Sequence, residues 1–310
     1  MPSTMIGKPQ PDSATAFPLA EGSVLELGGR DAGSFLQAQS MNDVAALADG
    51  HWQWNGCLSA KGRVLALFAL LRIDATRFVL FLPDLPAADL AAHLRRYQFR
   101  ARLEMLCRDE LVPCGVLDDA ATQWPLRGNG AQAAASVSAD SIALDFGGAQ
   151  ARQLLLRAPA GCATGCTPAA IADAQARWRR ADLAHGLPRL GPAQHDQYTP
   201  QMLSLERLGA FSLTKGCYPG QEIVARTHYL GQSKRALQLL HVEGDAEPGA
   251  ALESVDGDAA PTAAGRVVST AADGEATLAL AVASPLPPDA QLRVAGIAAT
   301  TRPLLAGLAR

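Results

Sequence analysis

Residues 215–222 form the densest group of reactive side chains in this sequence. They read Lys-Gly-Cys-Tyr-Pro-Gly-Gln-Glu, so eight positions carry a cation, a thiol, a phenol, an amide and a carboxylate. A Pro-Gly pair favours a turn, and glycine lets another backbone or a ligand approach closely. We therefore predict a loop that holds these polar groups near one another. A plain polar turn between two core segments is the alternative.

The thiol of Cys217 is the candidate reactive group in this loop. The neighbouring Lys215 and exposed loop N–H groups would lower the pKa of the thiol and raise its thiolate fraction. A cysteine nucleophile also needs a positioned base, and His228 follows eleven residues later. A buried, inert cysteine fits the sequence equally well, so both interpretations stay open.

Cations gather at two other points of the chain. Lys61-Gly-Arg63 precedes an apolar run, and Arg226, Lys234 and Arg235 follow the 215–222 loop. If the two groups converge, they would hold a polyanionic ligand such as a phosphate or a carboxylate tail. The alternative is a set of solvated strand ends.

A flat heterocycle is a second ligand class that the sequence can accommodate. Trp178 lies on the apolar face of an expected helix, either as a core residue or as a platform for a ring. Gln221 and Glu222 would complement such a ring, because a carboxylate accepts two parallel N–H bonds and an amide both donates and accepts.

Metal and dinucleotide sites are not expected. Cys162 and Cys166 are four residues apart, but no second Cys or His pair has zinc-site spacing. The six cysteines are scattered and no export signal is evident, which favours reduced thiols over a disulfide framework. Gly128 and Gly130 lack the context of a nucleotide-binding turn, so a loop is predicted there.

Length and composition narrow the class of protein. The chain has 310 residues, 48% of them hydrophobic and 18% charged, which is typical of a folded protein with two or three domains. A net charge of −3 argues against broad binding to nucleic acid or acidic membranes. The longest apolar run, at 64–71, is too short to cross a bilayer. We expect a cytoplasmic protein.

The first two thirds of the chain alternate between strand and helix patterns. Strands are predicted at 23–27, 63–73, 78–82 and 100–106. One helix, capped by Asp31, is predicted to run through Phe35, Leu36 and Gln39, and a second is predicted at 84–97. Residues 125–150 are predicted as loop. Thr167 and Pro168 should start a helix that places Ile171, Ala174 and Trp178 on one face and ends at Gly186.

From residue 235 onward the pattern changes to short apolar segments. They lie at 236–242, 265–269, 276–283 and 291–299 and are separated by acidic or Gly/Pro-rich turns. This spacing predicts a small antiparallel barrel or sandwich. The expected organisation is a flexible lead at 1–19, an α+β region at 20–235 and a β-barrel at 236–310.

These motifs together resemble the YgfZ family of folate-binding proteins, which is related to the T protein (aminomethyltransferase) of the glycine cleavage system. Residues 215–222 match the family signature KGCYxGQE, and the match continues through Arg226 and Lys234-Arg-Ala-Leu237. Pro200-Gln201 followed by Leu205, the segment 35–43 and Ala60-Lys-Gly-Arg63 resemble further family segments in the same order. The resemblance covers about residues 20–240.

The resemblance implies a fold and a function. The fold is α+β, with interwoven α/β-sandwich subdomains of the aminomethyltransferase-like folate-binding type and a small C-terminal β-barrel. The implied cofactor is tetrahydrofolate or a related folate. The implied role is accessory, without robust turnover, in assembly or repair of iron–sulfur proteins and in iron–sulfur-dependent tRNA modification, with iron–sulfur proteins or their assembly machinery as partners.

Residue by residue, the resemblance assigns Cys217 as a redox or transfer thiol. It assigns ligand contacts to Lys61, Arg63, Asn42, Asp43, Trp178, Lys215, Gly216, Tyr218, Gly220, Gln221, Glu222 and Arg226. The sequence departs from the family at Ala184, where the related transferase uses a glutamate, and at Ala38, Met41 and Gly22. The missing acid at Ala184 counts against the alternative function, a folate-dependent aminomethyltransferase. A protein-interaction scaffold is a third possibility.

Overall fold

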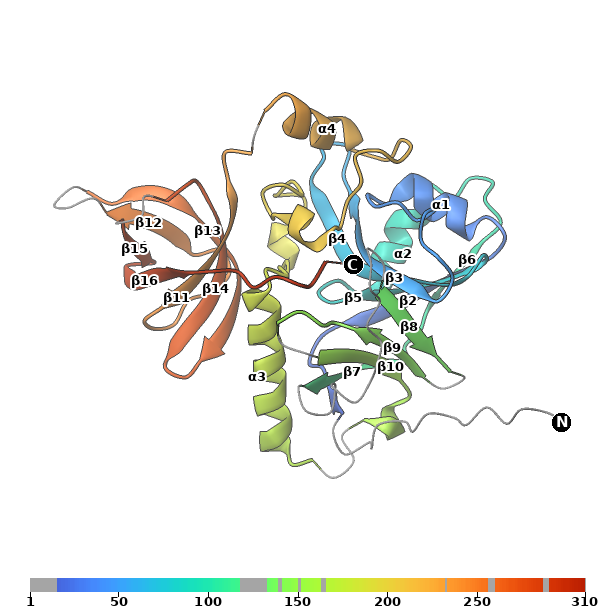
Figure 1. Ribbon diagram of the computed structural model, residues 1–310, viewed down its shortest axis with the longest axis horizontal. Coiled ribbons are helices and arrows are strands. Elements are labelled where there is room, and N and C mark those ends of the chain that lie inside the picture. The colour runs from blue at the N-terminus through green and yellow to red at the C-terminus, as the bar shows by residue number, and fades with distance from the viewer. Residues whose placement is uncertain are drawn as a thin grey trace.

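The computed structural model shows an α/β region beside a separate barrel (Figure 1). It describes residues 16–117, 133–138, 141–149, 152–162, 166–231, 233–255, 260–286 and 290–309. The long helix α3 (Pro168–Ala184) lies between the two parts and contacts the barrel strands β13 and β14 as well as strands β1 and β7 of the sheet. The expected α+β class with a C-terminal barrel is confirmed.

Ten strands form one antiparallel sheet in the α/β region. Their order across the sheet is β1-β7-β10-β9-β8-β3-β4-β5-β2-β6. The strands are β1 (Phe17–Pro18), β2 (Ser23–Gly28), β3 (His51–Leu58), β4 (Val64–Asp74), β5 (Arg77–Leu82), β6 (Glu104–Cys107), β7 (Val112–Leu117), β8 (Ala133–Val137), β9 (Ser141–Asp145) and β10 (Arg152–Arg157). Strand β3 joins the two halves of the sheet, because it pairs with both β4 and β8.

Three shorter helices complete the α/β region: α1 (Ala32–Gln39), α2 (Ala87–Arg95) and α4 (Gln221–Tyr229). The helix expected to follow Asp31 and the helix expected at 84–97 are both present, and α2 buries Leu90 and Leu94. Thr167 caps α3 as predicted, its side chain accepting a hydrogen bond from Ala170 N–H. Asp31 occupies the N-cap position of α1 as predicted, but its carboxylate makes no cap hydrogen bond and instead accepts from Arg102 N–H on the neighbouring segment.

Two parts of the secondary-structure prediction were wrong. Within the loop expected at 125–150, residues 133–137 and 141–145 form β8 and β9, whereas Gly128 and Gly130 lie outside the described residues. Both strands have only five residues, and β8 is alanine-rich, so their partners rather than their own composition hold them extended. Phe17–Pro18, which fall within the expected lead at 1–19, pair with β7.

The barrel has its own core. Its strands are β11 (Ala236–Val242), β12 (Ala251–Val255), β13 (Thr262–Asp273), β14 (Ala276–Ala283), β15 (Gln291–Val294) and β16 (Ile297–Arg302), and β16 pairs with β11 to close it. The chain after β16 then runs back towards the sheet (Figure 1). There Leu305 N–H donates to Ala184 O, and the indole N–H of Trp54 donates to Leu308 O at 2.9 Å. The C-terminal segment therefore ties the α/β region to the barrel.

One disulfide corrects the expectation of reduced thiols. Cys114 of β7 and Cys162, just after a 3₁₀ turn, are bonded, with their Cα atoms 6.4 Å apart. That separation falls within the usual range for a disulfide. The sequence placed the two cysteines 48 positions apart and gave no sign that the fold would bring them together. Cys57, Cys107 and Cys217 are free thiols.

Candidate functional site

Lys215 ties the signature loop, residues 215–222, to the end of helix α1. Its ammonium donates hydrogen bonds to the backbone carbonyls of Gln37, Ser40 and Asn42, with N···O distances of 2.6, 2.7 and 2.8 Å. Burial lowers the pKa of Lys215 to about 8, against the opposing charge of Asp43. The group is still protonated at neutral pH. All three of its N–H donors are therefore engaged by carbonyls, one in the last turn of α1, one at its C-cap and one in the segment that follows.

The remaining polar groups of the signature loop have different roles. The Tyr218 hydroxyl donates to Ser212 O, and burial raises the pKa of Tyr218 to about 12. The Gln221 amide donates to Lys215 O at 3.3 Å. Cys217, in contrast, is exposed. Tyr218, Gln221 and Lys215 thus hold the loop, while the thiol faces solvent.

Gly220 and Gly62 bring the signature loop into contact with the turn at 59–63. Gly220 has φ +77°, and a Cβ there would lie 2.5 Å from Ser59 O and 2.7 Å from Gly62 Cα. Gly62 has φ +67°, and its Cβ would lie 2.6 Å from Ile223 Cβ. Both positions therefore need glycine for backbone angle and for space. The two motifs that the sequence singled out separately are joined here.

The cations of these motifs do not form a closed anion pocket. Lys61 and Arg226 are exposed, and the Arg63 guanidinium donates to Gln197 O. Glu222 is exposed in the first turn of α4. His228 is in the last turn of α4, with its ring edge-on to Tyr229. This region is a solvent-facing surface beside the Cys217 thiol.

Asn42 and Asp43 take part in the backbone framework. The Asn42 amide donates to Trp54 O and Gly209 O, at 2.9 and 2.7 Å. The Asp43 carboxylate accepts from the Gln37 side chain and from Ala46 N–H. These contacts position the segment that Lys215 also holds.

Trp178 lies elsewhere, on α3, and its ring is largely covered. The side chain is 2% exposed, and the guanidinium carbon of Arg152 is 4.7 Å from its ring centroid. Phe146 and Phe17 pack against it with centroids 5.8 and 6.3 Å away. With these neighbours in place, Trp178 has little free face on which to stack a ligand. Its indole N–H has no hydrogen-bond partner among the described residues.

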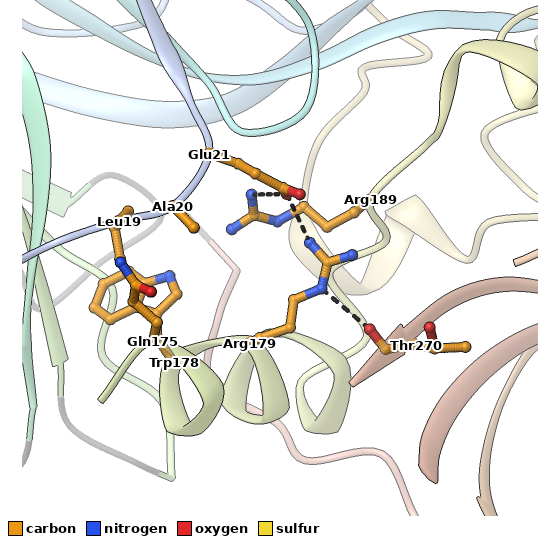
Figure 2. A pocket seen from close by; sticks show the side chains of 8 residues that line it. All are labelled: Leu19, Ala20, Glu21, Gln175, Trp178, Arg179, Arg189 and Thr270. Atoms are coloured by element: carbon orange, nitrogen blue, oxygen red, sulfur yellow. Dashed lines mark hydrogen bonds and ion pairs between the residues drawn. The ribbon is translucent and has the colours of Figure 1, made fainter. Parts of the chain in front are cut away.

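A cavity of about 270 Å³ lies next to Trp178 (Figure 2). Figure 2 shows Arg179 and Arg189 on either side of the Glu21 carboxylate, which is 3.1 Å from Arg179 and 3.8 Å from Arg189. Arg179 also donates to Thr270 O of the barrel strand β13. The lining therefore comes from α3, from the segment between β1 and β2, and from the barrel. Two guanidiniums make the lining rich in donors, and Trp178, which borders the cavity, carries a buried indole N–H without a partner among the described residues.

A buried triad of charged side chains holds Arg189 in the wall of this cavity. The Asp182 carboxylate, fully buried, lies 2.6 Å from Arg152 and 2.6 Å from Arg189. Burial alone would raise the pKa of Asp182, but the two guanidiniums hold it below its usual value. Arg189 also donates to Pro83 O. Arg189 is thus fixed before any ligand arrives, which lowers the entropy cost of binding.

A second cavity, of about 580 Å³, shares Glu21, Arg179 and Arg189 with the first. It is lined further by Asp84, at the end of β5, and by the segment 190–192. Burial raises the pKa of Asp84 to about 6, although Leu190 N–H and the charge of Arg189 oppose the rise. The volume of this second cavity is in the range of small-molecule sites.

The structure thus divides the predicted site residues between two regions. None of the described residues that line the two cavities comes from 59–63 or 215–226. Sequence reasoning missed Glu21, Asp84, Arg179 and Arg189. Arg179 directly follows Trp178, but no motif indicated that Arg189 and Glu21 would meet it. In the described part of the chain, no three His, Cys, Asp or Glu side chains are arranged to hold a metal ion.

Curated relatives share most of the chain. The tRNA-modifying protein YgfZ of Edwardsiella ictaluri is 31% identical over 283 residues, which cover 87% of this chain and 85% of the relative. The protein of the same name from Vibrio vulnificus is 31% identical over 286 residues, covering 88% and 85%. This chain belongs to the YgfZ family. A scan against protein-family models found no match.

A solved structure supports the fold of this YgfZ family member. The glycine cleavage system aminomethyltransferase T from Bartonella henselae aligns with a TM-score of 0.70, over 93% of this chain and 85% of the other, at 19% identity. At that identity the likeness concerns the fold alone. Among the helices that the structure describes, none has both the length and the apolar character needed to cross a membrane.

Proposed function

We propose that this YgfZ family member binds a tetrahydrofolate-type ligand in the two joined cavities beside α3. The observation that carries the proposal is the set of donors there: the Trp178 indole N–H, Arg179 and Arg189. A folate carries carboxylates at one end and ring carbonyl and amino groups at the other. Guanidiniums bind carboxylates in a bidentate geometry, and their attraction is strong where water is partly excluded.

This placement revises the roles we expected from the sequence. Trp178 would act through the edge of its ring, as an N–H donor, because its faces are packed. Arg179 and Arg189 would take the place of Lys61, Arg63 and Arg226 as partners of the ligand's carboxylates. The residues of the signature loop, including Gly216, Gln221 and Glu222, would belong to a separate surface.

The signature loop supplies the second half of the proposal. Cys217 is exposed on a loop that Lys215, Gly220 and Tyr218 hold in place, so its thiol is accessible to a partner. We propose that the protein is an accessory factor in assembly or repair of iron–sulfur proteins, in the cytoplasm, and thereby supports iron–sulfur-dependent tRNA modification. Relatives named tRNA-modifying protein YgfZ support the last step.

A folate-dependent aminomethyltransferase is the rival function, favoured by the fold of the solved neighbour. Such an enzyme needs an acid–base group near the reacting nitrogen. Ala184 has no such group, and its backbone carbonyl accepts from Leu305 N–H. Incubation with tetrahydrofolate and an aminomethyl donor separates the two functions, since formation of methylene-tetrahydrofolate at catalytic rates would favour the enzyme.

Binding of 5-formyl-tetrahydrofolate, followed by calorimetry, tests the ligand proposal. Wild type should bind, and Trp178→Phe, which keeps an aromatic ring but removes the N–H, should bind several-fold more weakly. Arg177→Gln, an exposed change one residue away, is the matched control and should bind as wild type does. Equal affinity of wild type and Trp178→Phe would remove the indole N–H from the site.

The thiol proposal is tested in a deletion strain. Growth and iron–sulfur enzyme activity are compared after complementation with wild type and with Cys217→Ser. The serine variant should restore little activity, because its hydroxyl cannot undergo thiol chemistry at neutral pH. Equal rescue by both would show that the thiol has no role.

A further inference from the structure

Asp84 is a carboxyl group that faces the larger cavity while being held in place. It follows Pro83 at the end of strand β5, and one carboxylate oxygen accepts from Leu190 N–H at 2.6 Å. No ion pair within 4.0 Å involves Asp84 among the residues that the structure describes. One oxygen is therefore anchored, and among the described residues no hydrogen bond or ion pair occupies the other.

The surroundings of Asp84 are mostly hydrogen-bond donors. Arg179 and Arg189 line the same cavity, and Glu21 is the other carboxylate there. Glu21 already interacts with both arginines. Asp84 is thus the carboxylate available to accept from a ligand. His195 also acts on it electrostatically, and its positive form would favour the ionised carboxylate.

We propose that Asp84 determines ring specificity by accepting two hydrogen bonds from the amino–amide edge of a pterin-like ring in the larger cavity. This assignment rests on the proposed function and identifies the residue that recognises the ring of the ligand. An adjacent N–H and NH₂ on one edge of a heterocycle match the two oxygens of a carboxylate. The residues that the sequence suggested for this contact, Gln221 and Glu222, lie on α4 and outside both cavities.

The burial of Asp84 supports a role in binding. Its pKa is raised to about 6, so the folded protein keeps an unfavourable charge near neutral pH that a neutral residue would avoid. Perturbed carboxyl groups in cavities gather at functional sites. A purely structural residue would only need to accept from Leu190 N–H, and asparagine does this equally well.

Asp84→Asn therefore separates the two roles. The amide oxygen keeps the contact with Leu190, whereas the NH₂ group opposes the donors of the ring. We expect affinity for 5-formyl-tetrahydrofolate at pH 7 to fall at least about tenfold, as expected for a bidentate contact replaced by a mismatched one. Affinity for p-aminobenzoyl-glutamate, which lacks the ring, should stay within about twofold. Asp89→Asn, an exposed change on α2, is the control.

The pH profile provides a second readout. With a pKa of about 6, the fraction of ionised Asp84 falls about tenfold between pH 7 and pH 5, and wild-type affinity should fall with it. The dependence should be absent in Asp84→Asn, where His195, Glu21 and the two arginines remain.

Each outcome has a distinct meaning. Wild type that binds neither probe overturns the proposed function and this assignment together. Wild type that binds, with equal affinity and pH profile in Asp84→Asn, overturns the assignment of Asp84 alone. Equal loss of both probes in the variant also overturns it, because a residue that reads the ring should not affect a ligand without one.

Discussion

Replacing Lys215 with methionine removes the ammonium but keeps a flexible apolar chain of similar length. Three backbone carbonyls, of Gln37, Ser40 and Asn42, then lose their donor. Leaving a buried acceptor without a partner costs about 1–3 kcal/mol. Some water reaches the Gln37 carbonyl, so we take the lower end of that range for each group. The free energy of unfolding should fall by about 3 kcal/mol.

Equilibrium unfolding in urea, followed by circular dichroism, measures this change. Lys234→Met is the matched control, since Lys234 is exposed, and it should change stability by no more than about 0.5 kcal/mol. Hydrogen exchange should also accelerate at the end of α1 and in the signature loop. If Lys215→Met were as stable as the control, the structural role of the Lys215 hydrogen bonds would be refuted. Lys215 would then again be a candidate ligand-binding cation.

Three further predictions follow from the same contacts. Gly220→Ala should lower the free energy of unfolding in urea by at least about 2 kcal/mol, because φ is +77° and the Cβ would meet backbone atoms. Gly216→Ala is the control and should be near neutral, because no atom lies within 4 Å of the added Cβ. Equal effects of the two substitutions would contradict the contact at Gly220. Asp182→Asn should cost about 3–5 kcal/mol by leaving two buried arginines underpaired, and a loss below about 1 kcal/mol would contradict it. The Asp84 pKa rises from 3.8 to about 6 on folding, so the stability that the protonated acid contributes is present below pH 3.8 and lost as pH rises through 6. Asp84→Asn should therefore be more stable than wild type by up to about 3 kcal/mol above pH 7, with the gap closing towards pH 4, and a gap independent of pH would contradict the buried charge.

Local patterns predicted most elements that have a strong signal of their own. The apolar runs at 63–73 and 78–82 became β4 and β5, and the Thr167-Pro168 pair began α3. The barrel followed from evenly spaced apolar segments. Strand β3 was not predicted, although Trp-Gln-Trp-Asn at 52–55 alternates between apolar and polar residues. The alternation covers only four residues, and pairing with β4 and β8 holds the whole strand extended.

The site depended on contacts that local sequence does not encode. The partners of the Lys215 ammonium lie more than 170 positions away in the sequence. A residue that the sequence suggested as a ligand-binding cation therefore holds the backbone instead. Trp178 was correctly placed on a buried helix face, but the neighbours that cover its ring come from β1, β10 and the segment after β9. Glu21, between β1 and β2, and Arg189, after α3, are distant in the sequence and meet only in the folded chain. Long-range packing, rather than any motif, assembled the cavities.

One measurement tests most directly whether the ligand and the thiol occupy separate regions. It is the dissociation constant of 5-formyl-tetrahydrofolate for wild type, Arg179→Gln and Cys217→Ser. Arg179 lines both cavities, whereas Cys217 is exposed on the signature loop. We predict that Arg179→Gln binds at least tenfold more weakly, a loss of about 1.4 kcal/mol of binding free energy. Binding by Cys217→Ser should be unchanged. The opposite pattern, with affinity lost on changing Cys217 and kept on changing Arg179, would place the ligand at the signature loop and contradict the two-region site.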